Sequence, residues 1–299
     1  MIKTNKQLIS LVLGSGGARG YAHIGVIEEL EKSGYEIASI SGSSMGALIG
    51  ALYACGKLEA YKEWILGLDL LDVAKLVDFS FTGTGMIQGD KVFAVIEEMI
   101  GDVMIEDLHI PFTAVATDLI KQKEVWLQKG NLIDAVRASI AIPTVFTPKK
   151  IGKRYLIDGG VLNPLPIAPT VSDNTDLTIA VNLSANIAKG YKIHIPKKER
   201  EKESGMEKVF FEMRQKAEQL FSKESKSAFD EMSMFDIMGR TIDIMQNAVM
   251  ECKMAGYAPD IIIGIPNDAG GFYEFNKAYE MIELGRVIAK EHLQEFKLR

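Results

Sequence analysis

Cysteine and histidine are both scarce in this chain. The two cysteines, Cys55 and Cys252, are too few for a disulfide framework, and we interpret them as small buried hydrophobic residues in a protein from a reducing compartment. Neither a Cys/His ligand spacing nor an EF-hand loop is present, so the sequence predicts no metal site and no cofactor. The few histidines stand in surroundings that favour structural or solvent-facing positions over catalysis. They are His23, His109, His194 and His292.

Long apolar runs and an excess of positive charge are missing as well. No segment approaches the roughly 18 uncharged apolar residues of a membrane span, and the short polar stretch 1–7 lacks the cleavage site of a signal peptide. We therefore expect a cytoplasmic protein whose membrane contact is at most peripheral. The net charge of −6 argues against nucleic acid as the main partner. It also argues against a general attraction to anionic membranes, although it does not exclude a local basic patch.

Apolar strands and amphipathic helices alternate along the first part of the chain. Residues 8–13 are typical of a buried strand, and residues 21–32 of a helix that ends at Gly34. A second strand at 36–41 and a second helix at 45–54 follow. This order predicts parallel strand–helix–strand units with right-handed crossovers.

The rest of the chain continues the alternation less regularly. Residues 57–109 are helical and irregular by pattern and contain a glycine-rich turn at 82–85. Methionine and phenylalanine side chains between residues 229 and 254, Met245 among them, are assigned to the core. Further strands are predicted at residues 111–117, 125–127, 155–157, 177–183 and 261–265, and further helices at residues 131–140 and 275–296.

Two glycine-rich turns each follow a predicted strand and precede a predicted helix. The first, Gly-Ser-Gly-Gly-Ala-Arg-Gly at residues 14–20, supplies backbone N–H groups at a helix start, where negative charge is stabilised. The second, Gly-Ser-Ser-Met-Gly at residues 42–46, has the G-x-S-x-G form that exposes the hydroxyl of its central serine. Ser44 is therefore a candidate nucleophile next to backbone N–H groups that could bind an anion. A nucleophile and an anion-binding site are the minimum that acyl transfer requires. For Ser44, the alternative is an ordinary helix N-cap. For the turn at residues 14–20, the alternative is a nucleotide-binding loop, but the lysine that such a loop requires is missing.

A serine hydroxyl needs a base, and Asp158 is the candidate that the sequence offers. It follows the predicted strand 155–157 and precedes Gly159 and Gly160, so it suits a sharp turn near the carboxyl edge of the sheet. Open α/β sheets place their sites at that edge. A free aspartate is a poor base at pH 7 because its pKa is about 4, but burial against apolar walls would raise that pKa. An ordinary Asp-Gly turn is the alternative interpretation.

Taken in order, the motifs resemble those of the patatin-like phospholipase family. They are the two turns at 14–20 and 42–46, Arg-Ala-Ser-Ile-Ala-Ile-Pro at 137–143, Asp-Gly-Gly at 158–160 and Asn-Pro-Leu-Pro at 163–166. The resemblance covers residues 8–185 strongly and residues 235–299 by pattern alone. It implies a three-layer α/β/α fold with a mainly parallel central sheet, in a single domain over residues 1–299.

The resemblance also implies a function, the hydrolysis of fatty-acyl esters in phospholipids or lysophospholipids by a Ser–Asp dyad. Ser44 would attack the ester carbonyl, and Asp158 would accept its proton and later activate water. Backbone N–H groups would hold the oxyanion. The implied oxyanion-hole residues are Gly16, Gly17 and Ala18. The implied supporting residues are Gly14, Arg19, Gly42, Gly46, Gly159 and Gly160, and Arg19 among them is interpreted as structural or charge-balancing. Where the family often has a further glycine, this chain has Ser15, which keeps its backbone N–H.

Residues 189–233 differ in composition from the rest of the chain. They are dense in Lys and Glu, and residues 206–221 place apolar side chains at helical spacing. We favour a helix packed on the domain or on a second subunit over a lid or membrane-facing helix, because the polar face mixes both charges. A C-terminal strand and helices over residues 234–299 complete the domain, and the oligomeric state stays open.

Two other functions stay open at this point. An acyltransferase to an alcohol or thiol acceptor would use a similar fold, but malonyl-type acyltransferases pair their serine with a histidine. A non-catalytic regulatory protein would keep the fold and act through a partner. Ser139 has no framing glycine and is assigned to packing rather than to nucleophilic attack.

Overall fold

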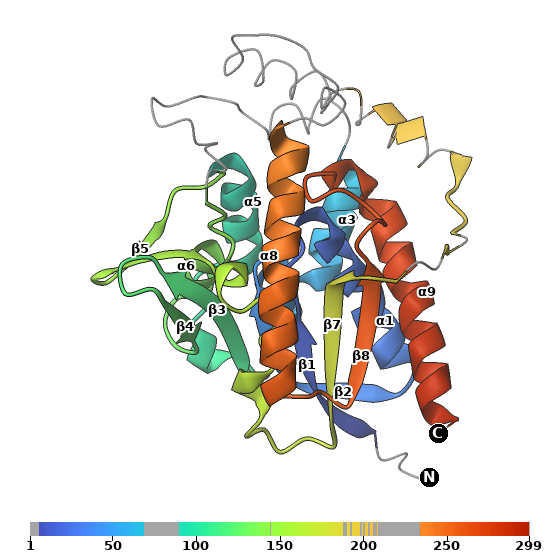
Figure 1. Cartoon of the computed structure of the whole chain (residues 1–299), viewed down its shortest axis with the longest axis horizontal. Coiled ribbons are helices and arrows are strands. Elements are labelled where there is room, and N and C mark those ends of the chain that lie inside the picture. Colours follow the sequence, from blue (N-terminus) through green and yellow to red (C-terminus); the bar gives the residue numbers. More distant parts are fainter. Residues whose placement is uncertain are drawn as a thin grey trace.

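The computed structural model describes residues 6–68, 90–143, 145–187 and 234–298, with scattered residues between 190 and 208. Eight strands of these residues form one sheet, with helices on both of its faces (Figure 1). The strand order is β5-β6-β3-β2-β1-β7-β8, and β4 pairs with β3 outside this path. The expected three-layer α/β/α fold is confirmed.

The helices and strands follow the predicted order, except that strand β5 was not predicted from the sequence. The strands are β1 (Gln7–Leu13), β2 (Tyr35–Ser43), β3 (Phe112–Asp118), β4 (Lys123–Leu127), β5 (Lys149–Ile151), β6 (Arg154–Asp158), β7 (Leu177–Ala185) and β8 (Ile261–Pro266). The helices are α1 (Ala22–Lys32), α2 (Met45–Ala54), α3 (Leu58–Gly67), α5 (Asp90–Ile100), α6 (Leu132–Ser139), α8 (Met234–Gly256) and α9 (Ala278–Lys297). A 3-10 turn, η1 (Gly17–Tyr21), leads into α1.

The sheet is mixed, with a parallel centre and an antiparallel edge. Strands β8, β7, β1, β2 and β3 pair in parallel, whereas β4, β5 and β6 pair in antiparallel fashion. The connections between β3 and β4 and between β5 and β6 are tight turns, which can join only antiparallel strands. Because β6 runs opposite to β3, its last residue, Asp158, pairs with Ala116 inside the sheet.

The central strands are buried on both faces, so their side chains alternate between two apolar layers. Leu11 and Leu13 of β1 belong to the core cluster that includes α1, α2 and α9. Val12 of β1 and Ala180 of β7 pack instead with Met250 of α8. Helix α8 therefore covers the face opposite to α1 and α9, as Figure 1 shows. Near-continuous apolar runs, rather than alternating ones, are the sequence pattern of such doubly covered strands.

Helices α1 and α9 cross at an unusually short distance because each has a glycine at the contact. A Cβ atom at Gly25 would lie 1.9 Å from the carbonyl oxygen of Ile282, and one at Gly285 would lie 2.1 Å from that of Ala22. Any side chain at either position would force the helices apart. The close crossing fixes α9 against α1 and, through α1, against the central sheet.

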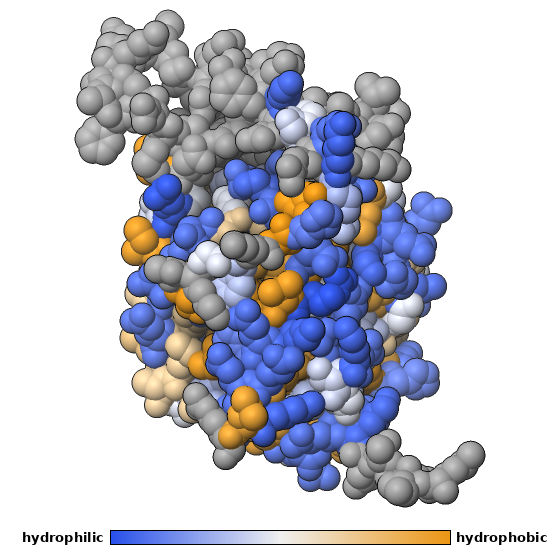
Figure 2. Space-filling model, turned by 90° about the vertical axis from the view of Figure 1, so that its right-hand side faces the viewer, coloured by the Kyte–Doolittle hydropathy of each residue, from blue (hydrophilic) through white to orange (hydrophobic). Residues whose placement is uncertain are grey.

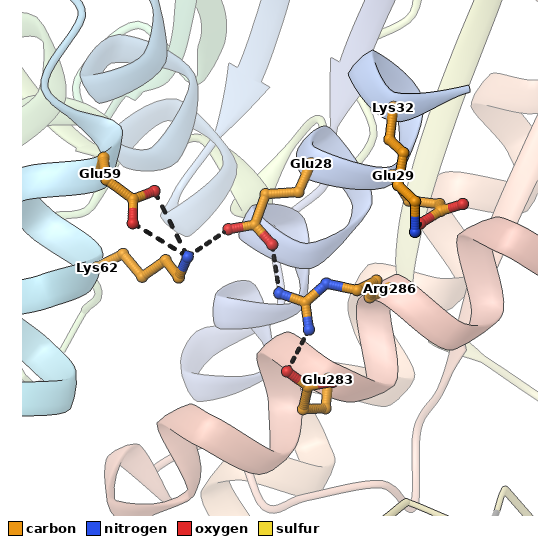
Figure 3. A network of polar contacts seen from close by, with 7 residues as sticks. All are labelled: Glu28, Glu29, Lys32, Glu59, Lys62, Glu283 and Arg286. Carbon is orange, nitrogen blue, oxygen red and sulfur yellow. Dashed lines mark hydrogen bonds and ion pairs between the residues drawn. The ribbon is translucent and has the colours of Figure 1, made fainter. Parts of the chain in front are cut away.

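Charged side chains link the same helices at the surface (Figure 3). Glu28 of α1 accepts a hydrogen bond from Arg286 of α9 and forms an ion pair with Lys62 of α3 at 2.7 Å. Arg286 also donates to Glu283, and Lys62 to Glu59. Burial alone would raise the pKa of Glu28, but the contacts with Lys62 and Arg286 hold it below its usual value. The network therefore joins three helices through one carboxylate.

Two expectations about burial are wrong. Cys252 lies on the outer side of α8 and is exposed, whereas Cys55 is half-buried. Met245, assigned to the core, is 59% exposed on the same helix, because α8 covers the sheet with one face and turns Met245 away from it. The turn at 82–85 and the apolar side chains of residues 206–221, with the question of a lid, lie outside the described residues.

Two features of the described residues concern contact with a membrane. No helix within the described ranges is both long enough and apolar enough to cross a membrane. The side of the molecule that carries α9, turned toward the reader in Figure 2, is covered mainly by hydrophilic side chains.

Candidate active site

Ser44 occupies a strained turn between β2 and α2. Its backbone angles, φ 54° and ψ −125°, fall in a region that residues other than glycine rarely adopt. A Cβ atom at Gly42 would lie 2.5 Å from the carbonyl oxygen of Gly46, and one at Gly46 would lie 2.1 Å from that of Leu13. The two glycines therefore let α2 begin directly against the ends of β1 and β2. Strain of this kind is common where a side chain must be aimed at a reacting group.

The Ser44 hydroxyl is not used to cap the helix. Although Ser44 stands at the N-cap position of α2, its side chain makes no capping hydrogen bond. Its Oγ donates instead to Oδ2 of Asp158 at 2.6 Å. The N-cap interpretation is therefore wrong for this serine, and the two residues singled out from the sequence lie in direct contact.

Asp158 is buried and held in place by the turn that follows it. Only 3% of its surface is exposed, and Ser44 is 1% exposed. The second carboxylate oxygen, Oδ1, accepts a hydrogen bond from the backbone N–H of Gly160 at 2.7 Å. Both oxygens of the carboxylate are thus oriented, one by the turn and one by the serine.

Burial changes the acid–base chemistry of this carboxyl group. Loss of solvent raises the pKa of Asp158 to about 7, and the hydrogen bonds from Ser44 and Gly160 oppose the rise without cancelling it. A carboxyl group with this pKa is partly ionised at neutral pH and is a much stronger proton acceptor than a free aspartate. The geometry and the pKa together suit Asp158 to accept the Ser44 proton.

The glycines after Asp158 are required by close packing. A Cβ atom at Gly159 would lie 2.1 Å from the carbonyl oxygen of Val115 in β3. One at Gly160 would lie 2.6 Å from Oγ of Ser15 and 2.4 Å from Nε2 of Gln246. The Asp-Gly-Gly sequence is therefore more than a flexible turn, because it lets the carboxylate approach β2, β3 and the glycine loop at once.

The glycine loop at residues 14–20 lies beside the serine turn. The close approaches of Gly46 to Gly14 and of Gly20 to Met45 place the two turns in contact. Gly14 and Ser15 donate their N–H groups to the carbonyl oxygens of Val181 and Pro164, respectively. The loop is thereby fixed to β7 and to the segment after Asp158.

The three predicted oxyanion donors are not equivalent. The Ala18 N–H donates to the carbonyl oxygen of Phe272 at 2.9 Å. Within the described part of the chain, the N–H groups of Gly16 and Gly17 donate to no protein acceptor. Gly17 also has a positive φ of 58°, and a Cβ there would collide with Phe272. The Gly16 and Gly17 amides are thus the donors that remain available to a ligand.

Arg19 acts inside the protein rather than at its surface. Its guanidinium is 1% exposed, donates to the carbonyl oxygen of Asn267 at 2.8 Å and to Oγ of Ser184 at 3.2 Å, and forms an ion pair with Asp243 of α8. These contacts tie the glycine loop to α8 and to the end of β8. They favour the structural interpretation of Arg19.

Two residues that contact the site have roles that the sequence did not reveal. Oγ of Ser139, at the end of α6, accepts the N–H of Ser44 at 3.0 Å and donates to the carbonyl oxygen of Val115 at 2.6 Å. Gln246 of α8 donates from Nε2 to Oγ of Ser15 at 3.1 Å. Ser139 stood inside one of the recognised motifs and Gln246 in a stretch assigned to the core, but only their contacts identify them.

The histidines take no part in the contacts of the dyad. His23 is buried, which lowers its pKa to about 4, and the hydrogen bond between its Nε2 and the carbonyl oxygen of Gly14 at 2.8 Å opposes this effect without cancelling it. His109 and His194 are exposed, and Nδ1 of His292 lies 3.0 Å from the carbonyl oxygen of Ile288. Among the described residues, no histidine forms a hydrogen bond with Ser44 or Asp158. The serine–histidine pair of a malonyl-type acyltransferase is therefore not found in this part of the chain.

Known proteins match the chain over the same region. A sequence profile of the family described as patatin-like phospholipase matches residues 11–171. A protein of Mycobacterium tuberculosis named as an uncharacterized NTE family protein is 37% identical over 332 aligned residues, which cover 97% of this chain and 92% of that protein. Patatin-like phospholipase domain-containing protein 6 of Mus musculus is 33% identical over 186 residues, covering 59% of this chain and 14% of that protein.

A solved structure supports the same fold. VipD from Legionella pneumophila matches 97% of this chain and 67% of its own chain with a TM-score of 0.54. Because the sequence identity is 16%, this likeness concerns the fold alone.

Proposed function

Because the chain belongs to the patatin-like phospholipase family, we propose that it is a lipid acyl hydrolase with Ser44 as nucleophile and Asp158 as base. The proposed substrates are fatty-acyl esters of phospholipids or lysophospholipids. The observation that carries the proposal is the 2.6 Å hydrogen bond from Ser44 Oγ to the buried carboxylate of Asp158. This hydrogen bond supplies the proton path that nucleophilic attack by a serine requires.

In the first half of the reaction, Ser44 Oγ attacks the ester carbonyl carbon and its proton passes to Oδ2 of Asp158. The carbonyl oxygen becomes an oxyanion, which the N–H groups of Gly16 and Gly17 are suited to bind. When the tetrahedral intermediate collapses, the ester C–O bond breaks and Asp158 returns the proton to the departing alcohol. The acyl group is left on Ser44.

In the second half, water takes the place of the alcohol. Asp158 accepts a proton from the water as the water oxygen attacks the acyl carbon. When the bond between the acyl carbon and Ser44 Oγ breaks, Asp158 returns the proton to Oγ and the fatty acid leaves. The two carboxylate oxygens have different roles: Oδ1 stays hydrogen-bonded to the Gly160 N–H, while Oδ2 accepts and returns the proton. No further general base is needed.

The test is covalent labelling of the nucleophile together with lipid turnover. A fluorophosphonate probe should label the parent protein and Ser41→Ala, but not Ser44→Ala. Ser41 is a matched control because it is a fully buried serine on β2, the strand that leads into Ser44, and its hydroxyl has no partner in the described structure. Labelling that persists in Ser44→Ala would contradict the proposal.

Turnover identifies the substrate class. Phospholipid, lysophospholipid and glyceride should be incubated with the parent protein and with Asp158→Asn, and released fatty acid measured by mass spectrometry. Loss of a general base typically costs about a hundredfold or more in rate, so Asp158→Asn should lose most of its turnover while remaining folded. Unchanged turnover in this variant would mean that another group acts as the base.

A further inference from the structure

Two hairpin turns lie side by side at the antiparallel edge of the sheet. Strand β3 leads through residues 119–122 into β4, and β5 leads through residues 152–153 into β6. The register of β3 with β6 places Asp118 opposite Leu156, so both turns extend from the same end of this strand pair. The N–H of Leu119 donates to the carbonyl oxygen of Tyr155 at 2.9 Å, which joins the first turn to the second hairpin.

The exposed residues of these turns form what we call the hairpin-tip surface. It consists of Leu119, Ile120, Lys121, Lys153, Arg154 and Tyr155. Ile120 is 72% exposed, and Leu119 and Tyr155 are each 45% exposed. Three large apolar or aromatic side chains thus stand among cations on adjoining turns.

The apolar tip is held in a defined conformation. The buried side chain of Asp118 accepts the N–H groups of Ile120 and Lys121 through Oδ1, at 3.1 and 2.9 Å. Gln122 closes the turn with a positive φ of 54° and donates its N–H to the carbonyl oxygen of Asp118. The exposure of Ile120 is therefore built into the turn by a buried carboxylate.

The chain segment that carries this surface has a net charge opposite in sign to that of the whole chain. Residues 119–155 contain eight Lys or Arg and two Asp or Glu, whereas the whole chain has a net charge of −6. Lys123 and Lys150 flank the surface, and Nζ of Lys150 lies 5.7 Å above the Tyr155 ring. Within the described residues, Lys121, Lys153 and Arg154 have no carboxylate partner. Their charges are thus free to act on a partner.

The hairpin-tip surface lies near the dyad. Asp158 ends the strand that Arg154 begins, so Arg154 lies four positions before Asp158, or about 13 Å along the strand. Strand β3 passes the dyad at Val115 and Ala116 before it reaches the turn at Leu119. The surface and the dyad share the carboxyl end of β3.

We propose that the hairpin-tip surface binds anionic phospholipid membranes. Lysine and arginine attract acidic head groups, and exposed aliphatic and tyrosine side chains partition into the boundary between head groups and acyl chains. The combination on one tip, in an otherwise acidic protein, is complementary to an anionic bilayer. The proposal goes beyond ester hydrolysis, because it states which lipid surface the protein docks on and through which residues.

Other faces of the described structure fit this partner less well. The side that carries α9 is mainly hydrophilic (Figure 2) and lies across the sheet from β5 in Figure 1. The outer face of α8 exposes Ile244 and Met245, at 70% and 59%, but Asp243 beside them is paired with Arg19. Helix α8 offers apolar surface without a comparable group of cations.

The experiment is vesicle co-flotation with the Ser44→Ala protein, so that no lipid is consumed. Vesicles of phosphatidylcholine with phosphatidylglycerol should carry the protein to the top of the gradient, and phosphatidylcholine alone should not. A cation near an anionic bilayer contributes about fivefold to binding. The charge reversals Lys121→Glu and Lys153→Glu together should therefore lower the partition coefficient more than about tenfold, and Ile120→Ser should lower it as well.

Matched controls distinguish an effect of this surface on binding from a general effect of net charge or of exposed apolar side chains. The pair Lys57→Glu and Lys290→Glu makes the same charge change at exposed sites elsewhere, and Ile244→Ser removes an equally exposed isoleucine from α8. Both controls should bind as the parent does. Equal loss in the controls, or parental binding by the charge-reversed protein, would overturn the proposal. So would binding of soluble RNA or polyglutamate through the same lysines without binding of vesicles.

The proposed hydrolysis is tested separately from the docking. With Ser44 restored, the surface variants should hydrolyse a soluble short-chain nitrophenyl ester at the parental rate and lose rate only on anionic vesicles. An absence of ester hydrolysis in all proteins would contradict the proposed function, while the flotation result would still decide the docking proposal.

Discussion

Asp158 combines two properties that seldom occur together in a carboxyl group. It is buried, and within the described residues it has no cationic partner. Buried aspartates are usually paired with a positive charge that lowers their pKa, whereas here only Ser44 and Gly160 oppose the effect of burial. The result is a carboxyl group whose pKa is set mainly by exclusion of water. A histidine is not needed for a proton acceptor with a pKa near neutrality.

The pKa of Asp158 predicts the pH dependence of catalysis. Only the ionised carboxylate accepts the Ser44 proton, so kcat/KM on a soluble ester should rise with pH and reach half its maximum at about pH 7. The measurement is a pH–rate profile with the parent protein. His23→Gln should show the same profile, because His23 has a low pKa and, among the described residues, its ring forms a hydrogen bond with the Gly14 carbonyl oxygen and not with Ser44 or Asp158. An acidic limb centred near pH 4 would contradict the buried state of Asp158.

At the scale of helices and strands, glycine decides how closely elements approach. The crossing of α1 and α9 depends on Gly25 and Gly285, and the serine turn depends on Gly42 and Gly46. In each case the atom that a Cβ would meet is a backbone carbonyl oxygen, which cannot move as a flexible side chain can. These contacts therefore constrain the sequence more strictly than ordinary apolar packing does.

The contact between α1 and α9 can be tested by adding one methyl group. Gly285→Ala would place a Cβ 2.1 Å from the Ala22 carbonyl oxygen, so the helices must separate. Overpacking of this kind costs about 3 kcal/mol, which urea unfolding should report as a lower midpoint. Gly256→Ala, at the end of α8 with nothing within 4 Å, should leave stability unchanged or raise it by about 0.5 kcal/mol. Equal stability of the two variants would show that the helices tolerate a wider separation.

For the whole molecule, the same buried carboxyl group links stability to pH. In the unfolded chain Asp158 loses its proton near its ordinary pKa of 3.8, but in the folded protein it keeps the proton to about pH 7. Between these values the folded state holds more protons, so this group lowers the free energy of unfolding as the pH rises. Above pH 7, where Asp158 is ionised in both states, the free energy of unfolding is lowered by the full amount.

Asp158→Asn should therefore be more stable than the parent protein at pH 8, by about 4 kcal/mol, because a pKa rise from 3.8 to about 7 corresponds to that free energy. The difference should shrink as the pH falls toward 4, where both side chains are neutral. Thermal unfolding at several pH values measures it, with Asp268→Asn as a control because Asp268 is exposed. A parent protein that exceeds Asp158→Asn in stability at pH 8 would show that the ionised carboxylate is better solvated than its burial indicates.

Much of the fold could be predicted from local patterns. Apolar runs of strand length followed by glycine turns predicted β1, β2 and the helices after them, because buried parallel strands and their crossover helices leave a strong periodic signal. The direction of β6 was not predicted, since a strand of five residues has the same pattern in either orientation. The exposure of Cys252 and Met245 was also missed, because α8 is apolar on more than the face that covers the sheet.

The residues of the candidate site were likewise predicted only in part. Ser44 and its glycines were predicted from a motif that is contiguous in the chain, and Asp158 from its strand and turn together with a family resemblance. Ser139 was not recognised as a contact of Ser44, nor Gln246 as a contact of Ser15 in the glycine loop. A serine at a helix end and a glutamine in an apolar helix carry no local sign of what they will touch.

By itself, the sequence determined the order of strands and helices, the strained serine turn and the residue types available for acyl chemistry, because these depend on neighbours a few positions away. Only the tertiary structure decided that Ser44 and Asp158, 114 residues apart, share a hydrogen bond. It also decided that the pKa of Asp158 is about 7. Contact and desolvation are properties of the packed chain, since both depend on which distant elements exclude water from the carboxylate.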